Sequence, residues 1–212
     1  MKILLLVFLI TLSACGKAPS SEVSDESFTA PEHISMDLSG EVPLEAMSFT
    51  TNLALNNFER EQEAKILQAA ELVREVIASR EFRNAVINHT YNGRKTFIDN
   101  RGLTNTQIYL MMLQGAEQLL PDSNNAMDVE LELYYQSNAT IGYTMPSTSR
   151  IWMNTKYFDS YEPYQVAGNL IHEWLHKLGF THSSEYNSAR PYSVPYAIGY
   201  IVRSMARENY TP

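Results

Sequence analysis

The stretch HEWLHKLGFTH, residues 172–182, contains three of the five histidines in the chain. His172 and His176 are four positions apart, so on a helix both imidazoles project from one face at a separation that one metal ion can bridge. A straight helix would carry His182 about 9 Å further along the axis than His176, out of reach of the same ion. The chain must therefore turn back before His182 if all three side chains are to meet.

Gly179 is the residue that allows this turn, because glycine readily adopts the left-handed conformation that ends a helix and reverses the chain. The pattern HExxHxxGxxH thus predicts two ligands from a helix and a third from the returning segment, which fill three of the four positions that zinc prefers. The fourth position is left for water. Glu173 lies beside the first ligand, where its carboxylate can reach that water without binding the metal.

A structural role is the competing interpretation of the same residues. A buried histidine with a satisfied hydrogen bond is commoner than a ligand, and a zinc ion can also hold together a binding module or an inactive pseudopeptidase. A purely structural zinc site normally closes its fourth position with a side chain and has no use for a carboxylate beside a ligand. Glu173 therefore favours a catalytic centre. A third interpretation is a metal hydrolase that acts on a non-peptide amide, with which the motif alone is also compatible.

Hydrophobic periodicity predicts an α+β domain around this stretch. Helices are expected over residues 59–80, 104–120, 162–178 and 196–209. Strands are expected over residues 129–136, where apolar and polar residues alternate, and over 140–145 and 150–157. The apolar run Met111, Met112 and Leu113 is expected in the core.

The five residues His172, Glu173, His176, Gly179 and His182 match the complete signature of the metzincin zinc peptidases. The predicted order of elements also resembles that family, in which a long helix and a mixed twisted sheet precede the active-site helix. The resemblance implies a zincin domain in which the three histidines bind Zn2+ and Glu173 is the general base. It implies an endopeptidase that acts on a peptide or protein substrate, aligned along an edge strand at 140–145.

The segment after His182 departs from that family. Metzincins place a methionine in a tight turn beneath the metal, and Pro195 stands at this position in Ser193-Val194-Pro195-Tyr196. We expect the proline ring to form the floor of the site in place of the thioether. Some metzincins use a tyrosine after this turn in the transition state. Tyr196 follows Pro195 by one residue rather than two, so packing of its ring in the cleft is favoured over that role.

The first fifteen residues have the features of a bacterial export signal. Lys2 precedes an apolar run over residues 3–12, which is too short to span a bilayer as a helix. The sequence LSAC resembles the lipobox of bacterial lipoproteins, and Cys15 is the only cysteine. We therefore expect a signal peptide at 1–14 and an exported protein that is anchored to a membrane through lipid on Cys15.

Residues 15–45 are rich in Ser, Pro and Glu and are typical of a flexible tether, whereas 46–212 are long enough for one domain. We expect this domain to be a monomer. A formal charge of −8 provides no basic surface for phosphates, so a nucleic-acid partner is not expected. The residues expected to be solvated or at turns are His33, His89, Asp99, Arg101 and Asp122.

Overall fold

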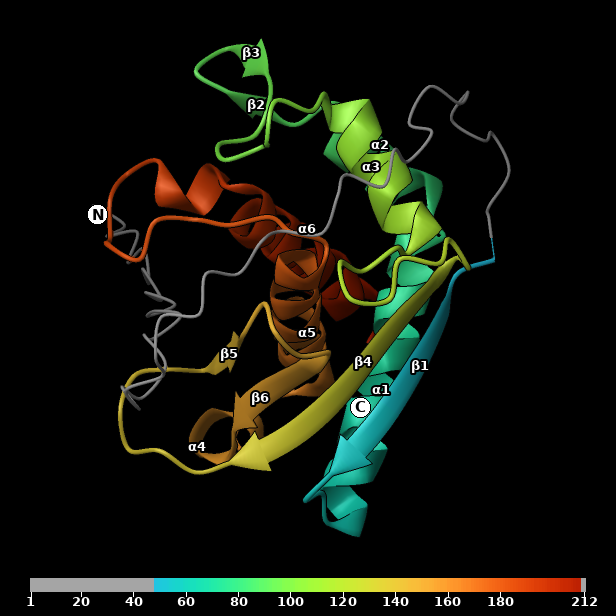
Figure 1. Cartoon of the computed structure of the whole chain (residues 1–212), viewed down its shortest axis with the longest axis vertical. Coiled ribbons are helices and arrows are strands. Elements are labelled where there is room, and N and C mark those ends of the chain that lie inside the picture. Colours follow the sequence, from blue (N-terminus) through green and yellow to red (C-terminus); the bar gives the residue numbers. More distant parts are fainter. Residues whose placement is uncertain (1–47, 211–212) are drawn as a thin grey trace, which may run out of the picture.

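The computed structural model describes residues 48–210, which form a mixed α+β domain (Figure 1). The α+β prediction is therefore confirmed. The expected signal peptide, Cys15, His33 and the rest of the tether lie outside the described residues. Lipidation and export thus stay predictions.

A four-stranded mixed sheet forms one layer of the domain. In spatial order its strands are β1 (Thr50–Asn56), β4 (Ala126–Tyr134), β6 (Arg150–Asn154) and β5 (Gly142–Thr144). β1, β4 and β6 are parallel, whereas β5 runs antiparallel to β6 at the edge of the sheet. A separate two-stranded hairpin consists of β2 (Thr90–Tyr91) and β3 (Arg94–Lys95).

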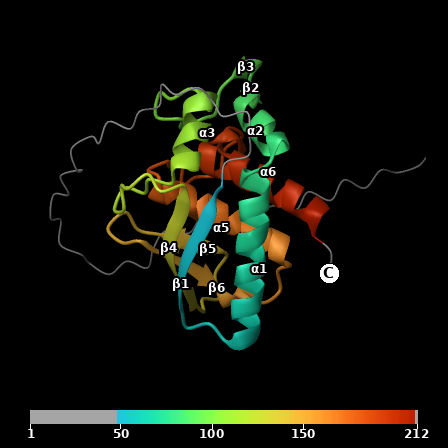
Figure 2. The same cartoon turned by 90° about the vertical axis from the view of Figure 1, so that its right-hand side faces the viewer.

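The helices pack against this sheet and against one another (Figures 1 and 2). They are α1 (Arg60–Ile77), α2 (Arg80–Ile87), α3 (Asn105–Gln114), α4 (Thr155–Phe158), α5 (Pro163–Lys177) and α6 (Val194–Asn209). α5 contacts both α1 and α6 and lies next to β5. Because of this central position, side chains of α5 can contact α1, α6 and β5.

The predicted apolar faces are buried. On α1 they are Ile66, Ala69, Ala70, Val73, Val76 and Ile77. On and directly after α5 they are Val166, Ala167, Leu170, Ile171, Trp174, Leu175 and Leu178. Met111, Met112 and Leu113 are buried as well. Apolar spacing therefore predicted correctly which side of each helix faces the core.

Two predicted helices end earlier than expected. The helix expected over 59–80 stops at Ile77, and the hydroxyl of Ser79 accepts a hydrogen bond from the Phe82 amide to begin α2. The helix expected over 104–120 stops at Gln114, because Gly115 adopts the left-handed conformation with φ 64°. Glycine, rather than the later proline, is the stop signal in α3.

The strand predictions were correct in position, but each was expected to end later than it does, and β4 begins three residues earlier than expected. Val129, Leu131 and Leu133 are buried as the alternation predicts, whereas Tyr135 lies beyond β4 and is 74% exposed. β6 ends at Asn154, whose side chain caps α4. β1 was not predicted, because its seven residues TTNLALN contain only two large apolar side chains.

Two glycines let α5 and α6 approach each other closely. A Cβ on Gly168 would lie 2.7 Å from the Arg203 Cβ and 3.0 Å from the Gly199 carbonyl oxygen. A Cβ on Gly199 would lie 3.0 Å from the Gly168 carbonyl oxygen and 3.4 Å from the His172 Cβ. The contact occurs one helical turn before His172, so it brings the start of α6 close to the histidines.

We expect Gly168→Ala to destabilise the protein, although alanine is the better helix former. The added methyl group would force α6 away from α5, and overpacking of this kind costs about 1–3 kcal/mol. Urea denaturation would measure the change. Ser204→Ala on the exposed side of α6 is the control and should change stability by less than about 0.5 kcal/mol. A Gly168→Ala protein as stable as the wild type would contradict the proposed close contact.

Candidate metal centre

The end of α5 and the segment that follows it bring three imidazoles together. His172 and His176 project from one face of α5, and their ring centroids are 5.1 Å apart. Gly179 adopts a positive φ of 88° and reverses the chain. The ring of His182 then lies 5.2 Å from that of His172 and 4.9 Å from that of His176.

The separation of the ring nitrogens fits one zinc ion. The Nε2 atoms of His172 and His182 are 3.3 Å apart. Two nitrogens that bind one tetrahedral zinc ion at about 2.05 Å lie about 3.3 Å from each other. One nitrogen from each of the three histidines lies within 4.8 Å of the other two. The three side chains could therefore hold one metal ion.

Each of the three rings is oriented by a backbone carbonyl. The contacts are from His176 Nδ1 to Phe180 O at 2.7 Å, from His182 Nδ1 to Ser183 O at 2.9 Å, and from the His172 ring to the Pro195 backbone. A carbonyl oxygen only accepts hydrogen bonds, so the ring nitrogen that faces it carries the proton. The opposite nitrogen then carries a lone pair rather than a proton, which is the form that binds a metal.

Electrostatics also favour the neutral imidazoles that metals require. Burial, with added repulsion from the other two rings, holds the pKa of His172 well below its usual value. Burial and the nearby His182 lower the pKa of His176 to about 4. Burial likewise lowers the pKa of His182. All three shifts favour the neutral form of the ring.

Glu173 follows His172 on α5, and its side chain lies close to the edge strand β5. Its side chain is buried, with 1% exposed. A Cβ on Gly142 of β5 would lie 3.4 Å from Glu173 Oε1 and 2.9 Å from Asn169 Nδ2. The absence of a side chain at Gly142 thus leaves room for the carboxylate. Glycine inside a short strand often marks such a close approach, and this was the only sign of it in the sequence.

The segment Ser193–Tyr196 lies against the histidines, but it is not a separate turn. A short 3-10 helix, η1 (Arg190–Tyr192), precedes it, and Ser193 caps α6. α6 thus begins at Val194 rather than at the predicted Tyr196, with Pro195 in its first turn, where proline is tolerated. The Pro195 backbone contacts the His172 ring. That the proline ring forms the floor of the site stays a prediction.

Tyr196 packs directly on two of the histidines. Its ring centroid lies 4.5 Å from that of His172 and 4.7 Å from that of His182, and the residue is 9% exposed. The ring therefore forms a wall of the site.

Two side chains expected to be solvated or at the surface have further contacts. His89 is half-buried and stacks on Phe97 with ring centroids 4.0 Å apart, so the expectation of a solvated side chain is wrong. Arg101 is exposed, but its Nη1 donates to the Leu178 carbonyl at 3.0 Å and supports the turn at Gly179. Asp99 and Asp122 are exposed as expected.

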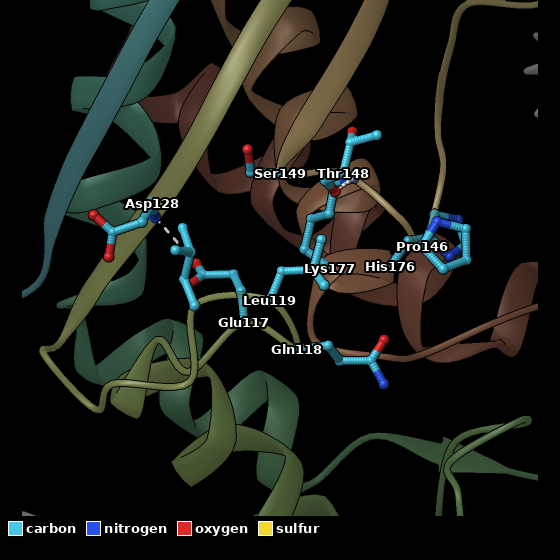
Figure 3. A pocket seen from close by; sticks show the side chains of 10 residues that line it. Glu117, Gln118, Leu119, Asp128, Pro146, Thr148, Ser149, His176 and Lys177 are labelled. Atoms are coloured by element: carbon cyan, nitrogen blue, oxygen red, sulfur yellow. Dashed lines mark hydrogen bonds between the residues drawn. The ribbon is translucent and has the colours of Figure 1, made fainter. Parts of the chain in front are cut away.

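Glu117 and Lys177 hold α5 in place from the side of the sheet (Figure 3). Glu117 Oε1 accepts hydrogen bonds from the Trp174 indole and from the Asp128 amide. Lys177 Nζ donates to the Thr148 carbonyl at 2.6 Å and to the Met145 carbonyl at 3.0 Å, which ties the end of α5 to the β5–β6 connection. Neither role could be read from the sequence, because each depends on residues that are distant along the chain.

No known family model matches this chain, and no curated protein matches its sequence. Within residues 48–210, no helix combines the length and the apolar character needed to cross a bilayer.

We expect Glu117 to make stability depend on pH. Burial raises its pKa from 4.5 to about 7, so the folded state binds this proton more tightly than the unfolded state. Its stabilising contribution is fully present below pH 4.5 and is lost as the pH rises through about 7. Compared with Glu117→Gln, the wild type should lose roughly 2 kcal/mol between pH 5 and pH 8. Denaturant unfolding of both proteins checks this, and parallel pH profiles would contradict it.

Proposed function

We propose that this chain is a zinc-dependent endopeptidase of metzincin type. The observation that carries the proposal is the cluster of three carbonyl-oriented imidazoles at zinc-ligand spacing. Glu173, the residue after the first histidine, is buried next to the edge strand β5. A three-histidine donor set leaves a fourth position for the reaction, which is typical of catalytic rather than structural zinc.

His172, His176 and His182 would hold the zinc ion. When bound, zinc lowers the pKa of a coordinated water and polarises a peptide carbonyl. Glu173 accepts the proton of the attacking water and passes it to the leaving amine. Burial of Glu173 and the packing of Tyr196 over two ligands keep bulk water away from this proton transfer.

The open edge of β5 supports a peptide as the substrate. The Asn154 amide donates to the Ile141 carbonyl, so Ile141 and Tyr143 direct their backbone groups toward β6. Because these directions alternate along a strand, the N–H and C=O of Thr144 face away from β6. An extended peptide can pair with this edge beside Glu173. With the lipid anchor expected on Cys15, we place the activity on a membrane-anchored, exported monomer.

We expect Glu173→Gln to keep zinc and the fold but to lose activity by about 10²–10⁴-fold, because the attacking water loses its proton acceptor. Metal analysis and cleavage of an unbiased peptide library measure the two properties separately. His176→Ala is the comparison and should lose the metal itself. Equal turnover in Glu173→Gln and wild type would exclude the mechanism. Wild-type protein that binds zinc but cleaves no peptide would favour a zinc-stabilised binding module or an inactive pseudopeptidase.

We expect Thr144→Pro to weaken cleavage of extended peptides roughly tenfold, because proline removes the outward-facing amide that would pair with the substrate. Thr144→Val keeps this amide but loses the hydroxyl that donates to the Arg150 carbonyl, so it is the matched control. Values of kcat/KM for both variants measure the effect on peptide alignment, and their unfolding curves measure the effect on folding. Equal losses in the two variants would mean that the amide does not align the peptide.

A further inference from the structure

Arg190 is a buried cation next to the candidate metal centre. It is 6% exposed and is the first residue of η1. Its amide donates to the side-chain oxygen of Asn187 at 2.9 Å, and its carbonyl accepts from the hydroxyl of the buried Ser193 at 2.8 Å. These contacts at both ends of the residue hold its backbone, and thus the base of its side chain, in one position.

The guanidinium lies over the ring that covers the histidines. Its Cζ atom is 4.7 Å from the centroid of Tyr196, and that ring is 4.5 Å from His172 and 4.7 Å from His182. Burial is the main cause of the low pKa of both histidines, and the positive charge of Arg190 lowers both further. The cation therefore acts at short range on the place where a substrate would bind.

The hydrogen-bonding capacity of Arg190 is not used up within the described part of the chain. Its Nε and Nη2 atoms are buried without a hydrogen-bond partner. The side-chain ion pairs between residues 48 and 210 involve Arg74 and Arg150, and none involves Arg190. Guanidinium groups are rarely buried without an anionic partner, because their desolvation is then uncompensated.

Stacking on Tyr196 does not account for these donors. A ring beneath a guanidinium contacts its face, whereas the N–H groups point outward in the guanidinium plane. Arg207 stacks similarly on Tyr164 at 5.9 Å, but Arg207 is exposed and its donors can reach water. The buried donors of Arg190 call for a planar acceptor with two oxygens, which a carboxylate provides.

We propose that Arg190 binds a carboxylate of the peptide substrate, so that the enzyme prefers a negative charge close to the scissile bond. This inference rests on the proposed peptidase function and specifies its substrate class. The carboxylate can come from an aspartate or glutamate side chain or from the C-terminus of the peptide. Since the chain has a formal charge of −8, such a preference would not follow from its overall charge and requires a local cation.

The test compares matched peptides on the whole protein purified with zinc. Three groups of peptides are compared. The first is neutral and amidated at its C-terminus. The second carries Asp or Glu at one position near the cleaved bond, and the third has its free C-terminal carboxylate near that bond. We expect kcat/KM to be about 10- to 100-fold higher for the second or the third group, which identifies the source of the carboxylate. Equal values for all three groups would overturn the inference while leaving the peptidase function intact.

Variants connect the preference to Arg190. Arg190→Gln should bring the ratio of kcat/KM for acidic peptides to kcat/KM for neutral peptides close to one. Arg190→Lys should keep part of the preference, because lysine supplies the charge but not the planar, two-donor geometry of the guanidinium. Arg207→Gln is the matched control and should keep the wild-type ratio. A ratio that Arg190→Gln leaves unchanged would overturn the inference.

A binding measurement separates the inference from catalysis. The probe is the Nε–Hε NMR signal of Arg190, which is assigned by its loss in Arg190→Lys. This signal is followed in zinc-loaded Glu173→Gln protein during titration with peptides. The peptides are an acetylated dipeptide acid, the corresponding amide, and amides that carry an acidic side chain. We expect a shift with a carboxylate-bearing peptide and none with the neutral amide. No shift with any carboxylate would overturn the inference. If no peptide of any kind is cleaved by wild type, the proposed function fails, and this titration still decides whether Arg190 binds carboxylates.

Discussion

The site depends on three imidazole rings meeting at one point, although one of them lies beyond the end of the helix that carries the other two. Gly179 makes this geometry accessible, and its position is doubly restricted. Its φ of 88° disfavours a side chain, and a Cβ there would lie 2.7 Å from Arg101 Nη1 and 2.8 Å from Gln118 Nε2. Backbone carbonyls then orient the rings, so the protein itself prepares the lone pairs that a metal needs.

The surrounding structure holds α5 from several sides. Gly168 allows α6 to approach α5 closely. The Trp174 indole donates a hydrogen bond to Glu117 and packs edge-on against Phe49. Lys177 donates hydrogen bonds to the β5–β6 connection. Each contact is made by a different element, so a shift of α5 would disturb all of them together. A helix held in this way would keep His172 and His176 in fixed positions, as the proposed metal site requires.

The sequence predicted the elements whose hydrophobic periodicity is strong. It did not predict features that depend on contact with a distant segment of the same chain. The buried faces of α1 and α5 were predicted because a helix repeats its apolar side every three to four residues. The end of α3 was predicted too late, because Pro121 rather than Gly115 was taken as the stop signal. The strand β1 was missed because its few apolar residues form a pattern only when β4 pairs with it. His89 was expected in solvent because only the fold places Phe97 against it.

By itself, the sequence determined the candidate ligands, the carboxylate beside them and the glycine turn, since all five residues lie within one helix and its first reversal. Only the tertiary structure placed the Pro195 backbone on His172, Tyr196 over two of the histidines, Gly142 against Glu173 and Arg190 over the Tyr196 ring. The physical reason is the range of the interactions. Helical spacing and glycine conformation are properties of neighbouring residues, whereas burial and through-space charge depend on the packing of elements that are far apart in the chain.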